Sequence, residues 1–381
     1  MGPLESVAHC TKRFTAPGRV NLLGEHTDYT GGLVLPMAIP FATTALVHAA
    51  HSGYTFTSTA FDGAHETFAG DDAPKTGNWS DYPVGVLREV LALGFDVPPF
   101  SLQLDGNVPL GAGLSSSASI EVATTVALLC HIGKSLTEKQ IALLCQRAEN
   151  RYVGSPCGIM DQFVVTAAIA GHALLLNTRD LSFEHLPMNS GALAGCSIVV
   201  ANSMVKHSIA NGDYGTRRRE LEIGQTAIRE AYPDVRDLGD ATMHQLEACR
   251  TSIPAESYLR CKHVITENAR VREAAEAMKR GDATALGDAM NRSHASQRDD
   301  FQDSVPEIDF LAAAAVTLPG CYGARLTGGG FGGCTVNLVE TAATESFQNA
   351  LAAAYRDRFG ITPETYICTP SDGALAQLEN S

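Results

Sequence analysis

The sequence predicts a mixed α and β protein that is large enough for two domains. The chain has 381 residues, of which 45% are hydrophobic and 18% are charged, the proportions of a globular protein with real cores. Residues 33–62 alternate in polarity and carry β-branched and aromatic side chains, which is typical of strands. Long stretches of the second half instead repeat apolar residues at helical spacing. Both element types are expected, and periodicity by itself predicts no more than that.

The first half is predicted to begin with strands and to continue with helices. Segments 43–47 and 54–57 are expected to form paired strands. Helical patterns follow at 81–94 and 117–132. The segment 135–138, Ser-Leu-Thr-Glu, has the form of a capping box and predicts the start of a further helix with an apolar face.

The remainder is predicted to alternate between short strands and long amphipathic helices. Apolar strands are expected at 173–177, 197–201, 334–339 and 364–368, and helices at 216–231, 241–250, 265–280 and 283–295. We place a domain boundary near residue 185, which predicts domains at 1–185 and 186–381.

Composition and charge argue against several classes of protein. The net charge is −14 and the longest basic run is the arginine triplet 217–219, which we interpret as a solvated helix face, so nucleic acid is not an expected partner. The ten cysteines lack zinc or CxxC spacing, which favours reduced thiols. No apolar run reaches the ~18 residues that span a bilayer. No targeting segment is recognised, so we expect a cytoplasmic protein without a membrane partner. The expected oligomeric state is a monomer, with an oligomer as the alternative.

A glycine- and serine-rich segment precedes the apolar helix expected at 117–132. Glycines let successive N–H groups point into one hollow, and a helix N-terminus favours an anion there. The lysine that follows the glycines in the Walker pattern is missing here. Phosphate binding would therefore need the serine hydroxyls and a cation from another part of the chain or a metal. The alternative is a serine-capped buried helix. The candidate phosphate-binding residues are Gly111, Gly113, Leu114, Ser115, Ser116, Ser117, Ala118 and Ser119.

A second motif, 17–32, is bounded by glycines and rich in polar side chains. It contains Arg19, Glu25, His26 and Asp28, a set of directional donors and acceptors that suits the hydroxyls of a small polyol. A solvated polar turn is one alternative. A metal site built from the last three residues is another, disfavoured because there is one histidine and no nearby cysteine at ligand spacing.

A third motif is the glycine-rich segment 326–334. Its glycines formally match the dinucleotide-binding fingerprint, but that fingerprint must open a helix, whereas 334–339 is strand-like. We therefore expect a glycine loop between two strands, where the backbone closes over a ligand.

Two acidic residues stand out beyond these motifs. Glu149 lies four residues after Cys145, on the apolar face of the helix predicted after residue 135. A buried carboxylate needs a cation or several donors, so Glu149 is either in an ion pair with an arginine or a Mg²⁺ ligand beside the phosphate-binding segment. Asp161, which follows Gly158, could be a helix N-cap.

The three motifs resemble the signature motifs of the GHMP small-molecule kinases. The resemblance continues through 157–163, 293–300 and 371–374. It implies an α+β fold of two domains, an N-terminal ribosomal-protein-like α/β sandwich and a C-terminal ferredoxin-like α/β domain, with the active site between them. The motif at 17–32 is similar to that of the branch that phosphorylates galactose.

The same resemblance implies roles for individual residues. Asp161 is implied as the general base that faces the anomeric hydroxyl of a sugar, with Arg19 beside it. Mg²⁺ is implied on Ser117 and Glu149. The sugar hydroxyls are implied to be held by Glu25, His26, Asp28, Gly158 and Tyr214. Trp79 resembles the adenine-contacting segment, although an ordinary core or surface aromatic is an alternative.

The expected activity is therefore transfer of the ATP γ-phosphate to the anomeric hydroxyl of α-D-galactose, with ATP and Mg²⁺ as cofactors. One alternative is another sugar 1-kinase, acting on N-acetylgalactosamine, arabinose or a uronic acid. The other is a non-catalytic regulator that binds galactose and ATP, which has no need of the full set of Ser115–Ala118, Glu149, Asp161 and Arg19.

Overall fold

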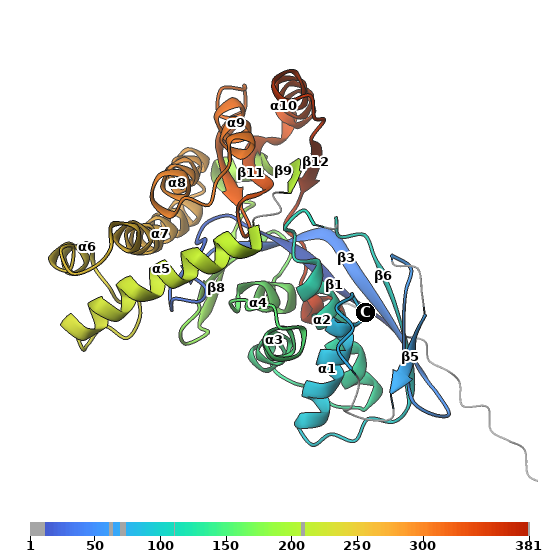
Figure 1. Ribbon diagram of the computed structural model, residues 1–381. Coiled ribbons are helices and arrows are strands. Elements are labelled where there is room, and N and C mark those ends of the chain that lie inside the picture. Colours follow the sequence, from blue (N-terminus) through green and yellow to red (C-terminus); the bar gives the residue numbers. More distant parts are fainter. Residues whose placement is uncertain (1–11, 61–63, 69–73, 110, 207–209, 380–381) are drawn as a thin grey trace, which may run out of the picture.

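The computed structural model describes residues 12–60, 64–68, 74–109, 111–206 and 210–379, and within these ranges the strands form three sheets. The first half contains a five-stranded sheet covered by helices, and the second half contains a four-stranded sheet with helices on both faces (Figure 1). A small sheet of β2 (Leu33–Val34), β7 (His172–Asn177) and β8 (Phe183–Pro187) lies in the first half.

The five-stranded sheet has the order β1-β3-β6-β4-β5. Its strands are β1 (Arg13–Asn21), β3 (Pro36–Ala49), β6 (Phe100–Gly106), β4 (Tyr54–Ser58) and β5 (Ala64–Phe68). The expectation that 43–47 and 54–57 pair with each other was wrong, because β6 lies between β3 and β4 and pairs with both. The alternate side chains of β6 are buried in the core under the helices, which explains why this strand is central.

Four helices pack on this sheet: α1 (Asp81–Ala92), α2 (Ser116–His131), α3 (Glu138–Arg147) and α4 (Met160–Ala167). The helices expected at 81–94 and 117–132 are confirmed. The capping box lies two residues further along than expected. Thr137 has an extended backbone and exchanges the capping hydrogen bonds with Gln140. After α3 the chain continues directly into a π-helical turn, η1 (Ala148–Val153).

The four-stranded sheet has the order β10-β11-β9-β12 and is antiparallel throughout. Its strands are β9 (Cys196–Lys206), β10 (Cys321–Thr327), β11 (Gly332–Glu340) and β12 (Glu364–Cys368). Alternate residues of β9 point to opposite faces: Ile198 and Val200 face α7 (Ala255–Lys279) and α8 (Ala283–Ser296), whereas Val199 and Ala201 face α9 (Pro306–Ala315) and α10 (Thr344–Phe359).

Six further segments complete the described elements. They are α5 (Ala210–Ala231), α6 (Met243–Ala248), α11 (Ala374–Glu379), the π-helical turn η3 (Gln297–Phe301) and the 3₁₀ turns η2 (Gly191–Gly195) and η4 (Thr341–Ala343). Helices α9 and α10 were not predicted, and α7 begins earlier than the expected 265.

The two halves share one hydrophobic core. Val20 and Leu35 of the first half lie in the same buried cluster as Val271 and Leu338 of the second. The predicted boundary near 185 falls within β8, and the next large strand begins at Cys196. No helix among the described residues is long and apolar enough to cross a bilayer.

Candidate active site

A cavity of about 680 Å³ lies where the two halves meet. It is bounded by the motif at 17–32, by the segment 154–161, by the beginning of α5 and by the third glycine motif. Six of the predicted site residues line it: Arg19, Glu25, His26, Asp28, Gly158 and Asp161. Tyr214 belongs to α5, but its side chain lies outside the described residues.

Arg19 and Asp161 form a bidentate ion pair. Nε and Nη2 of Arg19 donate to the two carboxylate oxygens at 2.6 and 2.5 Å, and Nη1 donates to the carbonyl of Gly113 at 2.6 Å. Burial alone would lower the pKa of the Arg19 guanidinium, but the negative charges of Asp161, Glu25 and Asp28 raise that pKa above its ordinary value. Arg19 is therefore charged, and it joins the acid to the phosphate-binding segment.

Asp161 lies in the first turn of α4, where Ile159 and not Asp161 is the N-cap residue. The N-cap alternative was wrong because Asp161 is the second residue of the helix and both of its carboxylate oxygens accept from Arg19. Ser115 Oγ also donates to Asp161 at 2.5 Å. Ser115 is the N-cap residue of α2 with a φ of 60° and makes no side-chain capping bond, so this serine holds the acid rather than the helix.

Asp28 and Gly158 are in close contact across the cavity. A Cβ atom on Gly158 would lie 1.8 Å from Asp28 Oδ2, so only glycine fits at this position. Burial raises the pKa of Asp28 to about 6, and the nearby charges of Asp161 and Glu25 add to the effect. This buried carboxylate lines the cavity and is a hydrogen-bond acceptor, as expected of a group that binds a hydroxyl.

Glu25 is fixed by the third motif and by Arg325, which the sequence did not predict. Its Oε1 accepts hydrogen bonds from Thr327 Oγ1 at 3.2 Å and Gly328 N at 3.0 Å, and lies 3.1 Å from Arg325 Nη2. Arg325 is fully buried. An arginine between apolar neighbours in a strand pattern was the signal available in the sequence. The motif at 17–32 and the third motif thus meet at one carboxylate.

His26 is held on both sides of its ring. Nδ1 lies 2.9 Å from the hydroxyl of Tyr29, Nε2 lies 2.9 Å from Asp303 Oδ2, and the ring stacks on Phe301 with centroids 3.7 Å apart. A sugar hydroxyl that bonds to this ring must therefore replace one of these partners. Asp303, fully buried, was not singled out in the sequence.

A second cavity of about 390 Å³ opens beside the start of α2. Its lining includes Trp79, Tyr82, Ser116 and Ser117, which places the aromatic segment next to the serines. Gly111 and Gly113 have positive φ values of 70° and 72°, so both use the conformation that glycine permits.

In the segment 111–119, the side chains of Leu114, Ala118 and Ser119 are buried in the protein interior. Ser119 donates its hydroxyl to the carbonyl of Ala16 and its N–H to the carbonyl of Ser115. The expectation that the Ser119 hydroxyl binds phosphate was therefore wrong: one helical turn after the glycines, that side chain faces the β-sheet rather than the cavity.

Glu149 is the acidic residue of η1, and it is buried close to a second carboxyl group, that of Glu121. Gln162 Nε2 donates to Glu149 at 2.7 Å and to Glu121 at 3.1 Å. Burial raises the pKa of Glu149 to about 7, Asp161 adds to this, and a hydrogen bond with Ser117 acts in the opposite direction. Burial and Glu149 raise the pKa of Glu121 well above its usual range.

These residues fit a hard divalent cation. No ion pair of Glu149 occurs among the described residues, so the alternative of a buried pair with arginine is not supported. A carboxylate and a serine hydroxyl are the oxygen donors that Mg²⁺ prefers. In the motif at 17–32, by contrast, the described residues contain no group of three His, Cys, Asp or Glu side chains that could hold a metal.

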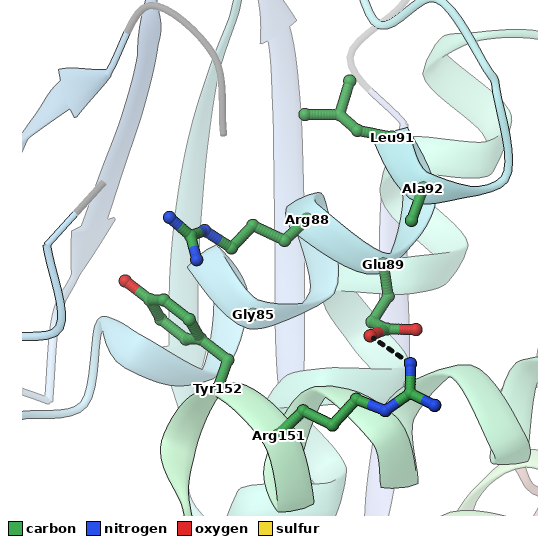
Figure 2. A pocket seen from close by; sticks show the side chains of 7 residues that line it. All are labelled: Gly85, Arg88, Glu89, Leu91, Ala92, Arg151 and Tyr152. Carbon is green, nitrogen blue, oxygen red and sulfur yellow. Dashed lines mark ion pairs between the residues drawn. The ribbon is translucent and has the colours of Figure 1, made fainter. Parts of the chain in front are cut away.

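A third hollow, of about 580 Å³, lies on α1 and η1. Figure 2 shows that both arginines of this hollow have partners within the protein. Arg151 forms an ion pair with Glu89, and Arg88 lies over the ring of Tyr152. None of the predicted site residues lines it.

Comparison with protein families matches three segments of the chain. Residues 8–49 match the galactokinase galactose-binding signature, 81–171 match the GHMP kinases N terminal domain, and 274–357 match the GHMP kinases C terminal domain. The last two matches bear out the expected two-domain α+β fold.

Relatives and solved structures agree with these matches. The chain is 40% identical to a galactokinase of Roseiflexus over 96% of this chain and 93% of the relative, and 40% identical to the human galactokinase over 94% and 91%. It superimposes on the Lactococcus lactis galactokinase complexed with galactose with a TM-score of 0.91 at 30% identity, covering 96% and 94%. The Methanococcus jannaschii mevalonate kinase shares the fold, with a TM-score of 0.68 at 16% identity over 96% and 100%.

Proposed function

Because this chain belongs to the galactokinases of the GHMP kinase family, we propose that it transfers the γ-phosphate of ATP to the anomeric hydroxyl of α-D-galactose, giving galactose 1-phosphate and ADP. The observation that carries the proposal is the bidentate pair of Arg19 and Asp161 in a cavity lined by further acids. A carboxyl group held by an arginine beside the phosphate-binding segment suits proton removal from a sugar hydroxyl.

In the proposed reaction Asp161 accepts the proton of the anomeric hydroxyl. The oxygen forms a bond to the γ-phosphorus while the bond from phosphorus to the β-phosphate oxygen breaks and ADP leaves. Arg19 pairs with Asp161 and orients both of its oxygens. Most of the acceleration is expected from positioning and electrostatics, with the proton transfer contributing about 10²–10⁴-fold.

The remaining residues divide between the two substrates. Glu25, Asp28 and the backbone at Gly158 would bind the sugar hydroxyls, and His26 and Tyr214 stay proposals for the same role. Trp79, Ser116 and Ser117 would receive the nucleotide. Mg²⁺, held by Ser117 and Glu149, would supply positive charge to the phosphate oxygens when bound.

The identity of the sugar is tested by the release of ADP across a panel of sugars. We expect galactose to exceed glucose in kcat/KM by about 10³-fold or more, because a misplaced hydroxyl leaves a buried polar partner unpaired. Faster turnover of N-acetylgalactosamine, arabinose or a uronic acid would assign another sugar 1-kinase. Absence of turnover with all sugars, despite binding of galactose and ATP, would assign the regulator.

The role of Asp161 is tested by Asp161→Asn, which keeps the size of the side chain and removes its charge. We expect kcat to fall by about 10²-fold or more, while the affinities for galactose and nucleotide, measured by calorimetry, change little. A variant that retains most of its kcat would contradict the proposed base and leave only positioning by Arg19 and the serine segment.

A further inference from the structure

The segment 24–33, called here the sugar loop, is anchored at its two ends by one helix of the other half of the molecule. At its start, Gly24 N donates to Glu267 Oε1 at 2.8 Å. At its end, Leu33 N donates to Asn268 Oδ1 at 2.7 Å. Both acceptors are buried side chains of α7, more than two hundred residues along the chain. Adjacent residues of one helix therefore set the separation of the loop's ends.

A third contact from α7 reaches the backbone between these ends. His263 Nε2 lies 3.2 Å from the carbonyl oxygen of Glu25, and His263 Nδ1 lies 3.0 Å from Ser296 Oγ. Burial, which outweighs the attraction of Glu267, lowers the pKa of this histidine to about 4. The ring is therefore neutral, and a carbonyl acceptor requires its hydrogen on Nε2.

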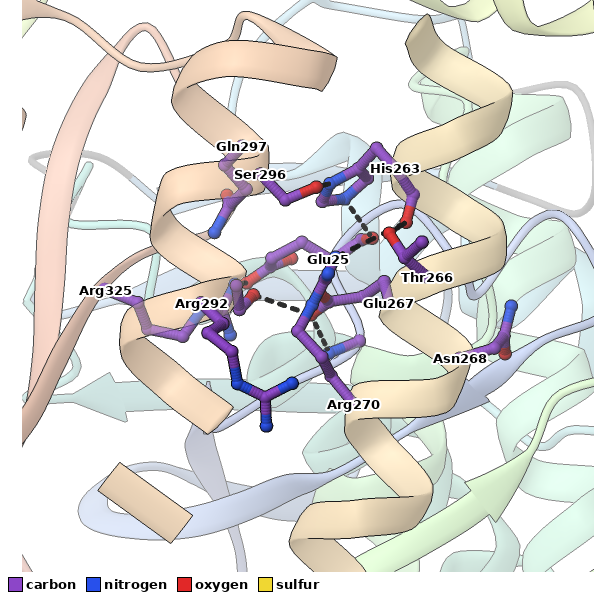
Figure 3. Close-up of polar contacts among 12 residues, drawn as sticks. Glu25, His263, Thr266, Glu267, Asn268, Arg270, Arg292, Ser296, Gln297 and Arg325 are labelled. Atoms are coloured by element: carbon purple, nitrogen blue, oxygen red, sulfur yellow. Dashed lines mark hydrogen bonds and ion pairs between the residues drawn. The ribbon is translucent and has the colours of Figure 1, made fainter. Parts of the chain in front are cut away.

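Glu267 is itself fixed by its surroundings. Oε1 also accepts from Ser293 Oγ at 2.7 Å, and Oε2 accepts from Arg270 Nε at 2.6 Å. The carboxylate has no exposed surface. Figure 3 shows this group between α7 and α8, with Glu25 beside it. Burial would raise the pKa of Glu267, but the charges of Arg270 and Arg325 and the hydrogen bond from Gly24 N lower it to about 2, so the acceptor is ionised.

The close approach of loop and helix is specific. A Cβ atom on Gly32 would lie 2.5 Å from Asn268 Oδ1, so the loop can reach this side chain only through glycine. Surface loops are usually the mobile parts of a fold, whereas here the loop rests on groups that are themselves bonded within a rigid helix pair. Such support preorganises the side chains that a ligand meets.

We propose that Glu267 and Asn268 are positioning residues for galactose: they hold the ends of the sugar loop so that Glu25, His26 and Asp28 are presented to the sugar before it binds. This inference rests on the proposed function, and neither residue lines the cavity. It predicts that affinity for the sugar, and not for the nucleotide, depends on two side chains behind the loop.

The test compares variants of the full-length protein. Glu267→Gln removes the charge that holds Arg270 but keeps an oxygen that can accept from Gly24 N. The double variant Glu267→Leu/Arg270→Leu removes the acceptor at the start of the loop without leaving an unpaired buried arginine. Asn268→Ala removes the acceptor at the other end of the loop. The matched control on the same helix is Glu273→Gln, because Glu273 is exposed and pairs only at the surface with Arg292 at 2.6 Å.

We expect KM for galactose to rise by about 10- to 100-fold in the double variant and in Asn268→Ala, since small displacements of binding groups have effects of this size. KM for ATP should stay within about twofold. Calorimetric affinity for galactose should fall in parallel. Hydrogen exchange of peptides covering 21–34 should become faster without sugar, while exchange in α2 is unchanged. Glu273→Gln should match the parent in all of these.

Folded variants with unchanged KM for galactose would overturn the proposal. Equal increases in the KM values of both substrates, with general loss of exchange protection, would also overturn it and assign a structural role only. If the parent protein itself fails to phosphorylate galactose, the proposed function is at fault. Exchange of 21–34 then still tests the anchoring of the loop.

Discussion

Arg19 shows how much of the chemistry depends on single residues. Three of its five N–H groups are bonded, two to Asp161 and one to the carbonyl of Gly113. Its role is to orient the acid and to join it to the phosphate-binding segment. Ser115, expected among the phosphate ligands, supports the same acid.

Asp28 provides a prediction of pH dependence at this scale. Its pKa in the folded protein is about 6, above the ordinary value of about 3.9 expected on unfolding. Ionised Asp28 therefore lowers the stability of the sugar-free protein above pH 6, and the effect disappears as the pH falls towards 4. Asp28→Asn should raise the free energy of unfolding by about 1–3 kcal/mol at pH 8.

The measurement is urea denaturation of parent and variant at pH 8 and pH 5. The gain should be clearly smaller at pH 5, where Asp28 of the parent is largely protonated, and the variant should bind galactose more weakly at both values. An equal gain at the two pH values would mean that ionisation of Asp28 is not its source.

At the scale of elements, the metal-binding proposal depends on where α3 ends. The helix changes into the π-helical turn η1 at Ala148, and the next residue, Glu149, faces Ser117 and Gln162. Short π-helical turns are frequently found at functional sites. The sequence predicted the burial of Glu149 from its spacing, but a regular helix was assumed.

Glu149→Gln should keep the fold and raise the Mg²⁺ concentration needed for half-maximal rate by about 10-fold or more, because an amide is a much weaker ligand. The magnesium dependence is measured at saturating galactose and ATP, and thermal unfolding checks the fold.

Glu121→Gln is the matched control for this experiment. Glu121 is buried and bonded to the same Gln162 amide, but it is not a proposed ligand. It should therefore leave the magnesium dependence within about twofold. A Glu149→Gln protein that unfolds with an unchanged magnesium requirement would identify Glu149 as a structural residue.

At the scale of the whole molecule, the shared core is the most consequential feature. Side chains from β1 and β3 pack in the same cluster as those from α7, α8 and β11, and the sugar loop is anchored on α7. The family matches assign two domains to the chain. Part of the apolar surface of each half is nevertheless buried only against the other half. We therefore expect the halves to unfold together.

Calorimetry should show one thermal transition for the full chain, with equal calorimetric and van't Hoff enthalpies. Galactose at about 100 times its Kd should stabilise the folded state by about 2.7 kcal/mol and shift the entire transition, whereas glucose at the same concentration should shift it little. Two transitions, with only one of them moved by galactose, would show that the halves are energetically independent.

Much of the fold was predictable where the signal is local. The helices at 81–94 and 117–132 and the strands at 334–339 and 364–368 are confirmed, because periodicity reports the buried face of each element. The pairing of 54–57 was wrong, since β6, which pairs with it, lies forty residues further along the chain. Nothing in a local pattern indicates which strand occupies the space between two others.

The sequence by itself determined the family, the two-domain fold class and the contiguous motifs, because a glycine loop or a run of serines carries its chemistry within a few adjacent residues. Only the tertiary structure decided which groups complete the site. The motif at 17–32 is contacted by Arg325, Asp303 and Glu267, each more than two hundred residues further along the chain. Their roles depend on burial and on opposite charge at a few ångströms, and both arise only when distant segments pack together.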